Sequence, residues 1–290
     1  MKIFKWTKLF LIVLLVITIA GCSAKNTQPT ETPTNLDIPN NLNSLILINS
    51  DDAWQSEIKD GLYGYDPNSG WGNIENIFST NVRYCKPWGA GFVLTFNANQ
   101  DSFFYIAIYN ADTTNKTLYI NTYDNKTPPY NWKNVLQQEI KSDTAKKYQI
   151  IKVNMASNDF YDNENRDGIQ QKFSIYAVDN NGSSVDSVKV AYIGNPGDKP
   201  ELLFSNVAYQ DSNLIVDVTN IGLTYAENVI VKVYDINNQE LATQTITLLN
   251  PNTTKELIFE NITNVASIKI DPDNAINEII EDNNQYALPQ

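Results

Sequence analysis

The chain has 290 residues, and its 33 acidic side chains outnumber 21 lysines and arginines, which gives a formal net charge of -12. This length fits two domains of ordinary size. An acidic surface repels phosphate backbones, so we expect no nucleic acid partner. The chain contains no histidine, which excludes hydrolase mechanisms that pair a serine or cysteine with a histidine base.

The N-terminal stretch has the composition of a secretory signal. Lys2, Lys5 and Lys8 precede an apolar run, Leu9 to Ile17, that closes on small residues. This run falls short of the roughly 20 residues that a bilayer-spanning helix needs. An uncleaved transmembrane anchor is the alternative interpretation, and both interpretations place the rest of the chain outside the cytoplasm and close to a membrane.

The end of this stretch, Thr18-Ile19-Ala20-Gly21-Cys22, resembles the lipobox of lipoproteins. In that family the chain is cut before the cysteine, and the new N-terminal cysteine receives lipid. The resemblance implies a signal peptide at residues 1–21, a lipid on Cys22, and a protein anchored by that lipid to the cell membrane at the cell surface. Loss of the signal removes three lysines and no acid, which leaves the mature chain at -15.

The second cysteine, Cys85, has no partner for an internal disulfide once Cys22 carries lipid. We expect Cys85 to be a small buried apolar residue, and stability outside the cell to come from packed cores.

Residues 22–43 are rich in threonine, proline and asparagine. Apolar residues are too sparse there to form a core. This composition predicts a lipidated, semi-extended tether that holds the folded part away from the bilayer.

From residue 44 to residue 194, short aromatic and β-branched runs alternate with clusters of turn residues. Apolar residues recur at every second position in these runs, as is typical of half-buried strands. The runs lie at residues 92–96, 104–108, 118–120, 151–155, 173–177 and 188–192. They predict an antiparallel sandwich, which we expect to be jelly-roll-like. Residues 52–59 and 131–140 are the two candidates for short helices.

The run from Gly194 to Pro200 interrupts this pattern. It contains two prolines and two glycines, which cannot extend a ladder, so we place the domain boundary there. Residues 200–290 return to the strand pattern, with the length of an immunoglobulin-like sandwich of about seven strands. The whole chain is therefore predicted to be all-β, with two antiparallel β-sandwiches in tandem.

The C-terminal module carries three motifs of a known family. Val218-Thr219-Asn220-Ile221-Gly222 ends one strand, Leu249-Asn250-Pro251 forms a turn, and the run from Asp271 to Asn284 closes the module. These motifs resemble the "V-T-N-x-G", "L-x-P" and "D-P-x-N-x-I-x-E-x-x-E-x-N-N" of CARDB, the cell-adhesion-related domain found in bacteria and archaea. The resemblance covers Pro200 to Ala287. It implies an immunoglobulin-like spacer or adhesion unit of an exported protein, and it implies no chemistry.

The N-terminal module is similar to galactose-binding-like carbohydrate-binding modules in the order of its strands from Val82 to Ile193. The chain departs from that pattern at three places. Ile108 stands where an arginine is usual, Asn125-Lys126 replaces an Asn-Gly turn, and Ala191 replaces an aspartate of the last strand. The resemblance implies a sandwich that binds carbohydrate.

Aromatic residues in turn-rich stretches are the candidate sugar contacts. Sugar binding needs flat apolar rings against the C–H face of a pyranose, with hydrogen-bonding groups around them. Loop aromatics are harder to explain as core than strand aromatics, although they also fold back as lids over the end of a sandwich. The candidates are Tyr63, Tyr65, Trp71, Trp88, Tyr130 and Trp132.

One acidic loop matches the first half of a calcium-binding pattern. Asn163, Asn165, Asp167 and Gly168 fit "D-x-[DN]-x-[DN]-G", in which alternate oxygen-bearing side chains converge on the ion. The distal glutamate is absent, since Ser174 stands at that offset. Calcium is therefore the one candidate cofactor, and a solvated acidic loop is the alternative. The candidate ligands are Asp159, Asp162, Asn163, Asn165 and Asp167.

These features predict a non-catalytic, lipid-anchored surface protein whose N-terminal sandwich binds a carbohydrate or another surface polymer. The first alternative is a structural or adhesive surface protein with a protein partner and no glycan, in which Trp71, Trp88 and Trp132 anchor the interface. The second alternative is a glycan-active enzyme that works with two carboxylates. We see no local constellation of acids for that chemistry, so we expect no catalytic residue.

Overall fold

The computed structural model describes residues 31–42, 44–47, 71–86, 89–98, 100–123, 132–142, 148–160 and 169–289. The chain divides into two compact units, Met1–Thr32 and Pro33–Gln290. In the described part of the second unit the strands form antiparallel sheets, which confirms the all-β prediction. Within the same described residues, no helix has the length and apolar character to cross a lipid bilayer.

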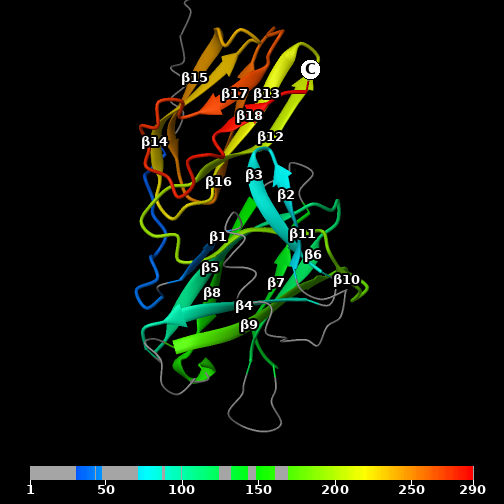
Figure 1. Ribbon diagram of the computed structural model, residues 1–290, viewed down its shortest axis with the longest axis vertical. Coiled ribbons are helices and arrows are strands. Elements are labelled where there is room, and N and C mark those ends of the chain that lie inside the picture. The colour runs from blue at the N-terminus through cyan, green and yellow to red at the C-terminus, as the bar shows by residue number, and fades with distance from the viewer. Residues whose placement is uncertain are drawn as a thin grey trace, which may run out of the picture. The chain divides into compact units, whose positions relative to one another are not determined.

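The N-terminal sandwich consists of two sheets, drawn mainly in cyan and green in Figure 1. One sheet has the order β2-β3-β11-β5-β8, with β1 paired to β11; its strands are β1 (Leu45–Leu47), β2 (Trp71–Ile77), β3 (Thr80–Cys85), β5 (Ser102–Asn110), β8 (Tyr148–Met155) and β11 (Val188–Gly194). The other sheet has the order β10-β9-β6-β7, with β4 paired to β9; its strands are β4 (Ala90–Phe96), β6 (Lys116–Tyr123), β7 (Trp132–Ile140), β9 (Ile169–Val178) and β10 (Ser184–Val185). A short 3-10 turn, η1 (Ser157–Asp159), follows β8.

Alternation along the strands decides which side chains enter the core. Phe173 and Ile175 of β9 and Leu118 and Ile120 of β6 are buried, and they belong to one apolar cluster between the two sheets. The ring of Phe173 stacks on Phe92 of β4, with ring centroids 5.0 Å apart. Because successive side chains of a strand point to opposite faces, the residues between these positions point outward.

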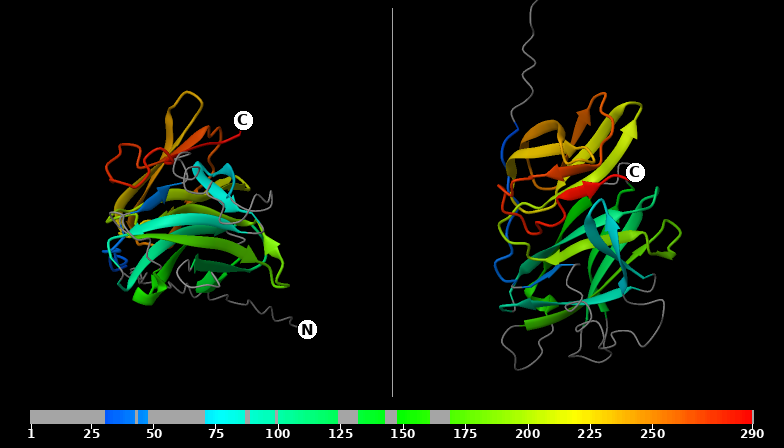
Figure 2. Two further views of the ribbon diagram at one scale, coloured as in Figure 1. Left: turned by 60° about the horizontal axis from the view of Figure 1, so that its bottom comes forward. Right: turned by 45° about the horizontal axis from the view of Figure 1, so that its top comes forward.

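The C-terminal sandwich also consists of two sheets, drawn from yellow to red in Figure 2. The first contains β12 (Leu202–Gln210), β13 (Asn213–Asn220) and β16 (Thr253–Phe259), in that order. The second has the order β15-β14-β17-β18, with β14 (Ala226–Tyr234), β15 (Glu240–Leu249), β17 (Ser267–Ile270) and β18 (Gln285–Ala287). Apolar residues from both sheets form a second core cluster, so this sandwich has its own interior.

The strand-end motif of the C-terminal module has a structural explanation. The Asn220 side chain is fully buried, and its Nδ2 donates to the carbonyl oxygens of Thr224 and Leu249 at 2.8 and 3.0 Å. Its Oδ1 accepts the backbone N–H of Gly222 at 2.9 Å. A Cβ at Gly222 would lie 2.4 Å from the carbonyl oxygen of Lys199, so only glycine fits that position. The asparagine and glycine of the motif therefore connect a strand end to the turn that follows β15.

Two local expectations differ from the structure. Residues 132–140 form strand β7 and no helix, because pairing with β6 along its whole length outweighs a weak helical pattern. The sequence predicts a tether up to residue 43, whereas residues 33–42, which we call the strap, lie against both sandwiches. The backbone N–H of Leu36 donates to the carbonyl oxygen of Leu223 at 2.8 Å, and Leu42 is 2% exposed. The apolar residues of the strap explain this difference, since each finds a place in a core cluster.

Candidate functional site

Three of the predicted site residues lie in the described part of the chain: Trp71, Trp132 and Asp159. The others lie outside the described residues: Cys22, Tyr63, Tyr65, Trp88, Tyr130, Asp162, Asn163, Asn165 and Asp167. Their roles stay predictions.

The two described tryptophans begin strands. Trp71 is the first residue of β2, and its indole Nε1 donates to the carbonyl oxygen of Gly91 at 2.7 Å. Its ring packs against the core of the N-terminal sandwich, which is the position of a lid over the core. Trp132 is the first residue of β7, half-buried and opposite Tyr123 in the strand register.

Asp159 ends the 3-10 turn, and both of its carboxylate oxygens have partners. Oδ2 accepts the backbone N–H of Ala156 at 2.8 Å, and Oδ1 forms an ion pair with Lys133. In the described ranges, no group of three or more Asp, Glu, Cys or His side chains is arranged to hold a metal ion. The other four candidate calcium ligands lie outside those ranges, so the calcium site stays a prediction.

The two sheets of the N-terminal sandwich have outer faces of opposite character. The outer face of the β2-β3-β11-β5-β8 sheet is apolar and forms one cluster with Leu203, Ile221 and Leu223 of the C-terminal sandwich. Within this cluster the hydroxyl of Tyr192 donates to the carbonyl oxygen of Ile221 at 2.7 Å. We call this contact region the junction. It covers one outer face of the N-terminal sandwich.

The outer face of the other sheet carries two stacked tyrosines. Tyr119 of β6 and Tyr176 of β9 lie directly opposite each other in the strand register. Their ring centroids are 5.0 Å apart and their planes differ by 6°. Both rings are half-buried, so each keeps part of its surface in solvent. Aromatic pairs across neighbouring strands pack well on such faces, and they present flat apolar surface.

Polar side chains surround the two rings. The Nδ2 of Asn121 donates to the Oγ of Ser174 at 3.3 Å, and the Nδ2 of Asn134 donates to the Oδ1 of Asn121 at 3.0 Å. On the other side of Tyr119, the exposed Gln137 is its register partner on β7. We call the set Tyr119, Tyr176, Asn121, Ser174 and Gln137 the tyrosine face; Ser174 is 0% exposed, and its hydroxyl holds Asn121 in place.

Glycines leave the flank of Tyr176 without a neighbouring side chain. Gly89 has a φ of +94°, and a Cβ there would lie 3.5 Å from the Cβ of Tyr176. Gly91 is the register partner of Ser174 on β4. Because neither residue carries a side chain, neither covers the tyrosine ring from the β4 direction. A half-exposed flat ring with amide side chains beside it has the chemistry that a pyranose needs.

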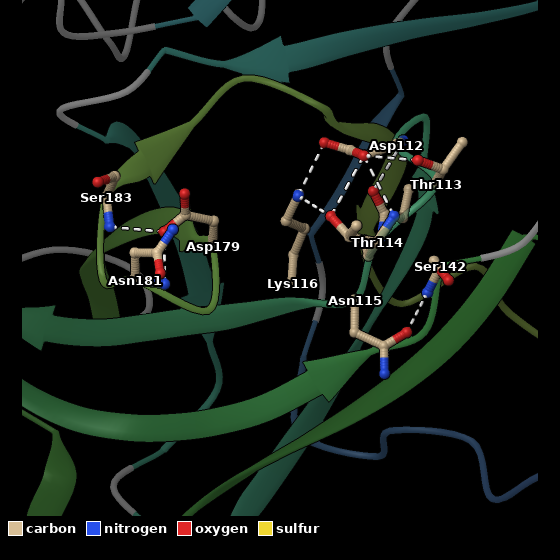
Figure 3. A network of polar contacts seen from close by, with 10 residues as sticks. Asp112, Thr113, Thr114, Asn115, Lys116, Ser142, Asp179, Asn181 and Ser183 are labelled. Carbon is tan, nitrogen blue, oxygen red and sulfur yellow. Dashed lines mark hydrogen bonds and ion pairs between the residues drawn. The ribbon is translucent and has the colours of Figure 1, made fainter.

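A polar network closes the end of this sheet (Figure 3). Lys116 begins β6 and is 3% exposed; its Nζ lies 2.8 Å from Asp112 Oδ2 and 2.6 Å from Thr114 Oγ1. The hydrogen bond from Lys116 is the main cause that lowers the pKa of Asp112 to about 2. In the view of Figure 3, Lys116 lies between this turn and the turn in which Asp179 Oδ1 accepts two backbone N–H groups. These bonds stabilise the two turns, and the lowered pKa keeps the Asp112 carboxyl ionised at neutral pH.

Our sequence reasoning missed the tyrosine face because it searched the loops. The signal was present in the strands, where Tyr119 interrupts the apolar pair Leu118 and Ile120, and Tyr176 interrupts Ile175 and Ala177. An aromatic residue at the outward position of a strand does not enter the core between the two sheets. Sequence alone does not place β6 beside β9, so it cannot bring these two rings together.

The C-terminal sandwich has the immunoglobulin-like class of fold that its motifs predicted. Residues 202–288 match the family model described as CARDB, so this module is a CARDB domain. The match confirms the resemblance expected for Pro200 to Ala287. A CARDB domain is adhesion-related and fits a surface protein. No curated protein matches the chain.

Similar solved structures include the β-glucuronidase of Ruminococcus gnavus. Its complex with uronic deoxynojirimycin has 11% identity and a TM-score of 0.23, and the match covers 60% of this chain and 33% of that one. The apo enzyme has 11% identity and a TM-score of 0.24, with 64% and 33% covered. The complex with N1-substituted uronic isofagomine has 11% identity and a TM-score of 0.25, with 68% and 35% covered. The matches thus span about a third of the enzyme, and at these values they support no inference about activity.

Proposed function

We propose that this chain is a non-catalytic, lipid-anchored surface protein whose N-terminal sandwich binds a carbohydrate on the tyrosine face. The observation that carries the proposal is the stacked pair Tyr119 and Tyr176, half-buried on an outer sheet face among amide and hydroxyl side chains. The opposite outer face is occupied by the junction. Among the described residues, the tyrosine face therefore offers aromatic surface that the junction does not cover.

The surface location rests on two independent features. The adhesion-related CARDB domain fits a protein displayed outside the cell. The lipobox-like sequence that ends at Cys22 supports attachment to the membrane through lipid. Labelling cells with a radioactive fatty acid tests the second feature: the label enters the wild-type chain and fails to enter the Cys22→Ala variant.

Binding to immobilised polysaccharides tests the ligand. We expect the full chain to bind at least one polysaccharide and to release no reducing ends from it. The double variant Tyr119→Ala/Tyr176→Ala removes both rings, and a central aromatic contact is worth about 2 kcal/mol, so binding falls by roughly thirtyfold or more. Tyr209→Ala is the matched control, because Tyr209 is a tyrosine of the C-terminal sandwich that is 48% exposed.

The outcomes separate the parts of the proposal. If the double variant binds like the wild type and has an unchanged melting temperature, the binding site does not lie on the tyrosine face. Absence of binding to every polysaccharide removes the carbohydrate from the proposal. Release of reducing sugar assigns an enzymatic activity in its place.

The second candidate function is adhesion to a protein. Exposed large apolar side chains of the described residues all lie on the C-terminal sandwich: Tyr209, Ile236, Leu241 and Ile258. Exposed apolar residues of this kind support protein contacts. This candidate is favoured if the chain captures one specific envelope protein equally well before and after enzymatic deglycosylation. The double variant Ile236→Ser/Leu241→Ser should then lose that protein.

A further inference from the structure

Two glutamates lie buried at the beginning of the C-terminal sandwich. Glu201 directly precedes β12, and Glu278 belongs to the closing segment, residues 271–284. Their side chains are 0% and 2% exposed. Among the described residues neither carboxyl takes part in an ion pair. A buried carboxylate without a cation is costly, so this pair needs an explanation.

Each carboxyl accepts at least one hydrogen bond from the element that carries the other. Glu201 Oε2 accepts the backbone N–H of Ile280, and its Oε1 accepts Asn283 Nδ2, both at 2.7 Å. Glu278 Oε2 accepts the backbone N–H of Leu202 at 2.6 Å, and its Oε1 accepts an amide hydrogen from Asn284 at 2.7 Å. We call these four side chains, Glu201, Glu278, Asn283 and Asn284, the glutamate clasp. The clasp fastens the closing segment to the start of β12.

The clasp contains more acceptors than donors. Asn283 Oδ1 and Asn284 Oδ1 are buried and have no hydrogen-bond partner within the described residues. A protonated carboxyl carries one O–H to donate, and an amide that is turned over presents its oxygen to that O–H. Protonation therefore removes buried negative charge and gives the clasp an O–H donor, where its four side chains otherwise donate only through amide nitrogens.

The surroundings favour the protonated form. Burial, with a smaller contribution from the charges of Glu281 and Asp271 in the same segment, raises the pKa of Glu278 to about 8. Burial and then the charge of Glu278 raise the pKa of Glu201 well above its ordinary value. Hydrogen bonds to both carboxyls lower these pKa values but do not outweigh burial.

The remaining charged and titratable neighbours do not neutralise the pair. Lys199 lies between the two sandwiches in the sequence. Its Nζ donates to Asn277 Oδ1 at 2.7 Å and to the carbonyl oxygen of Glu278 at 3.0 Å, so these hydrogen bonds do not go to the two carboxyls. Tyr192 faces the clasp from the N-terminal sandwich, where burial and then the charge of Glu201 raise the pKa of its phenol. Tyr105 in turn faces Tyr192.

The clasp is connected to the junction by two hydrogen bonds. The carbonyl oxygen of Glu201 accepts the backbone N–H of Ile221 at 2.8 Å. The carbonyl oxygen of Ile221 accepts the hydroxyl of Tyr192 at 2.7 Å. A movement of Glu201 therefore reaches the contact between the two sandwiches.

We propose that the glutamate clasp is a proton-dependent fastening: protonated carboxyls hold the closing segment and the junction in place, and loss of these protons in alkaline surroundings loosens both. This inference is independent of the carbohydrate proposal, because the tyrosine face lies on the other sheet of the N-terminal sandwich.

The sign of the effect follows from linkage. A carboxyl whose pKa is higher in the folded chain holds its proton more tightly there than in the unfolded chain. Its stabilising contribution is fully present below the ordinary carboxyl pKa and is lost as the pH rises through the folded pKa, which is about 8 for Glu278. For each such carboxyl, the unfolding equilibrium constant rises about tenfold per pH unit within this window.

Thermal unfolding and hydrogen exchange of the full chain test the clasp. We expect the wild-type melting temperature to fall from about pH 6 to about pH 9, and the fall to be smaller in Glu278→Gln and Glu201→Gln, which keep the shape without the charge. Glu240→Gln is the matched control, because Glu240 is exposed on β15 and pairs with Lys232. Over the same pH range, exchange corrected for intrinsic rates accelerates at Leu202, Ile221 and Ile280, and does not accelerate in β15.

Three results overturn the proposal. The first is a wild-type melting temperature that does not fall across this pH range. The second is a fall that is equally steep in both clasp variants. The third is a pH-insensitive wild type whose melting temperature rises with added calcium chloride, since that result assigns the pair to a cation. If Glu201→Gln fails to fold, Glu278→Gln decides alone, because it removes the same repulsion.

Discussion

Replacing Tyr192 with phenylalanine removes a single oxygen atom from the junction between the two sandwiches. Tyr192 is 1% exposed, and its hydroxyl donates to the carbonyl oxygen of Ile221 at 2.7 Å. The ring remains packed in the variant, so the loss is confined to this hydrogen bond. A hydrogen bond of this kind contributes about 1 kcal/mol net, and a buried acceptor left without a donor costs about 1–3 kcal/mol. We expect Tyr192→Phe to lower the free energy of unfolding by about 1–2 kcal/mol.

Urea denaturation measures this change with two probes. Trp71 and Trp132 lie on strands of the N-terminal sandwich, and no tryptophan follows residue 132, so tryptophan fluorescence reports none of the C-terminal sandwich, while far-ultraviolet circular dichroism reports both sandwiches. Because both sandwiches contribute to the hydrogen bond, we expect both probes to shift to lower urea. Tyr209→Phe is the control, since its hydroxyl lies on a side chain that is 48% exposed and water replaces its partner, so its effect stays within about 0.5 kcal/mol. Equal stabilities of the two variants would refute a structural role for the junction hydrogen bond.

Two further predictions concern titratable groups of the N-terminal sandwich. Burial raises the pKa of the Cys85 thiol to about 12. In a Cys22→Ser chain we therefore expect Cys85 not to react with a thiol reagent at about pH 8 until the chain is unfolded. Rapid labelling of the folded chain would contradict this prediction. The pKa of Asp112 is lowered to about 2, mainly by its hydrogen bond from Lys116, so its stabilising contribution is present above the ordinary carboxyl pKa and is lost as the pH falls through about 2. The Lys116→Met variant removes this contribution, so its melting temperature should fall less than that of the wild type between about pH 4 and about pH 2. An equally steep fall in both proteins would show that the pair of Asp112 and Lys116 does not contribute to stability.

The fold class was predictable because alternation of apolar residues is a local property. The predicted runs at residues 104–108, 151–155 and 188–192 lie within β5, β8 and β11. The stretch at residues 131–140 has a weaker pattern, and the interpretation as a helix was wrong. Its pairing partner β6 decides its structure, and pairing between distant segments cannot be read from a local window.

The candidate site was less predictable than the fold. Trp71 was chosen as a loop aromatic, but it begins β2 and donates a hydrogen bond to Gly91. Tyr119 and Tyr176 are 57 positions apart in the sequence, and only the register of β6 and β9 brings their rings to 5.0 Å. The strap shows the same limit of local sequence patterns. Its proline- and asparagine-rich composition predicts a tether, and composition does not reveal that its few apolar residues pack against both sandwiches.

The sequence by itself determined the alternation that makes strands, the CARDB motifs at residues 202–288, and the small residues that those motifs require. These features depend on neighbours along the chain, so they are present before any tertiary contact forms. The tertiary structure alone decided which outer face carries the stacked tyrosines, which face the junction covers, and which two of the many glutamates are buried together. Each of these depends on contacts between residues far apart in the chain, and burial and pairing exist only once those residues meet.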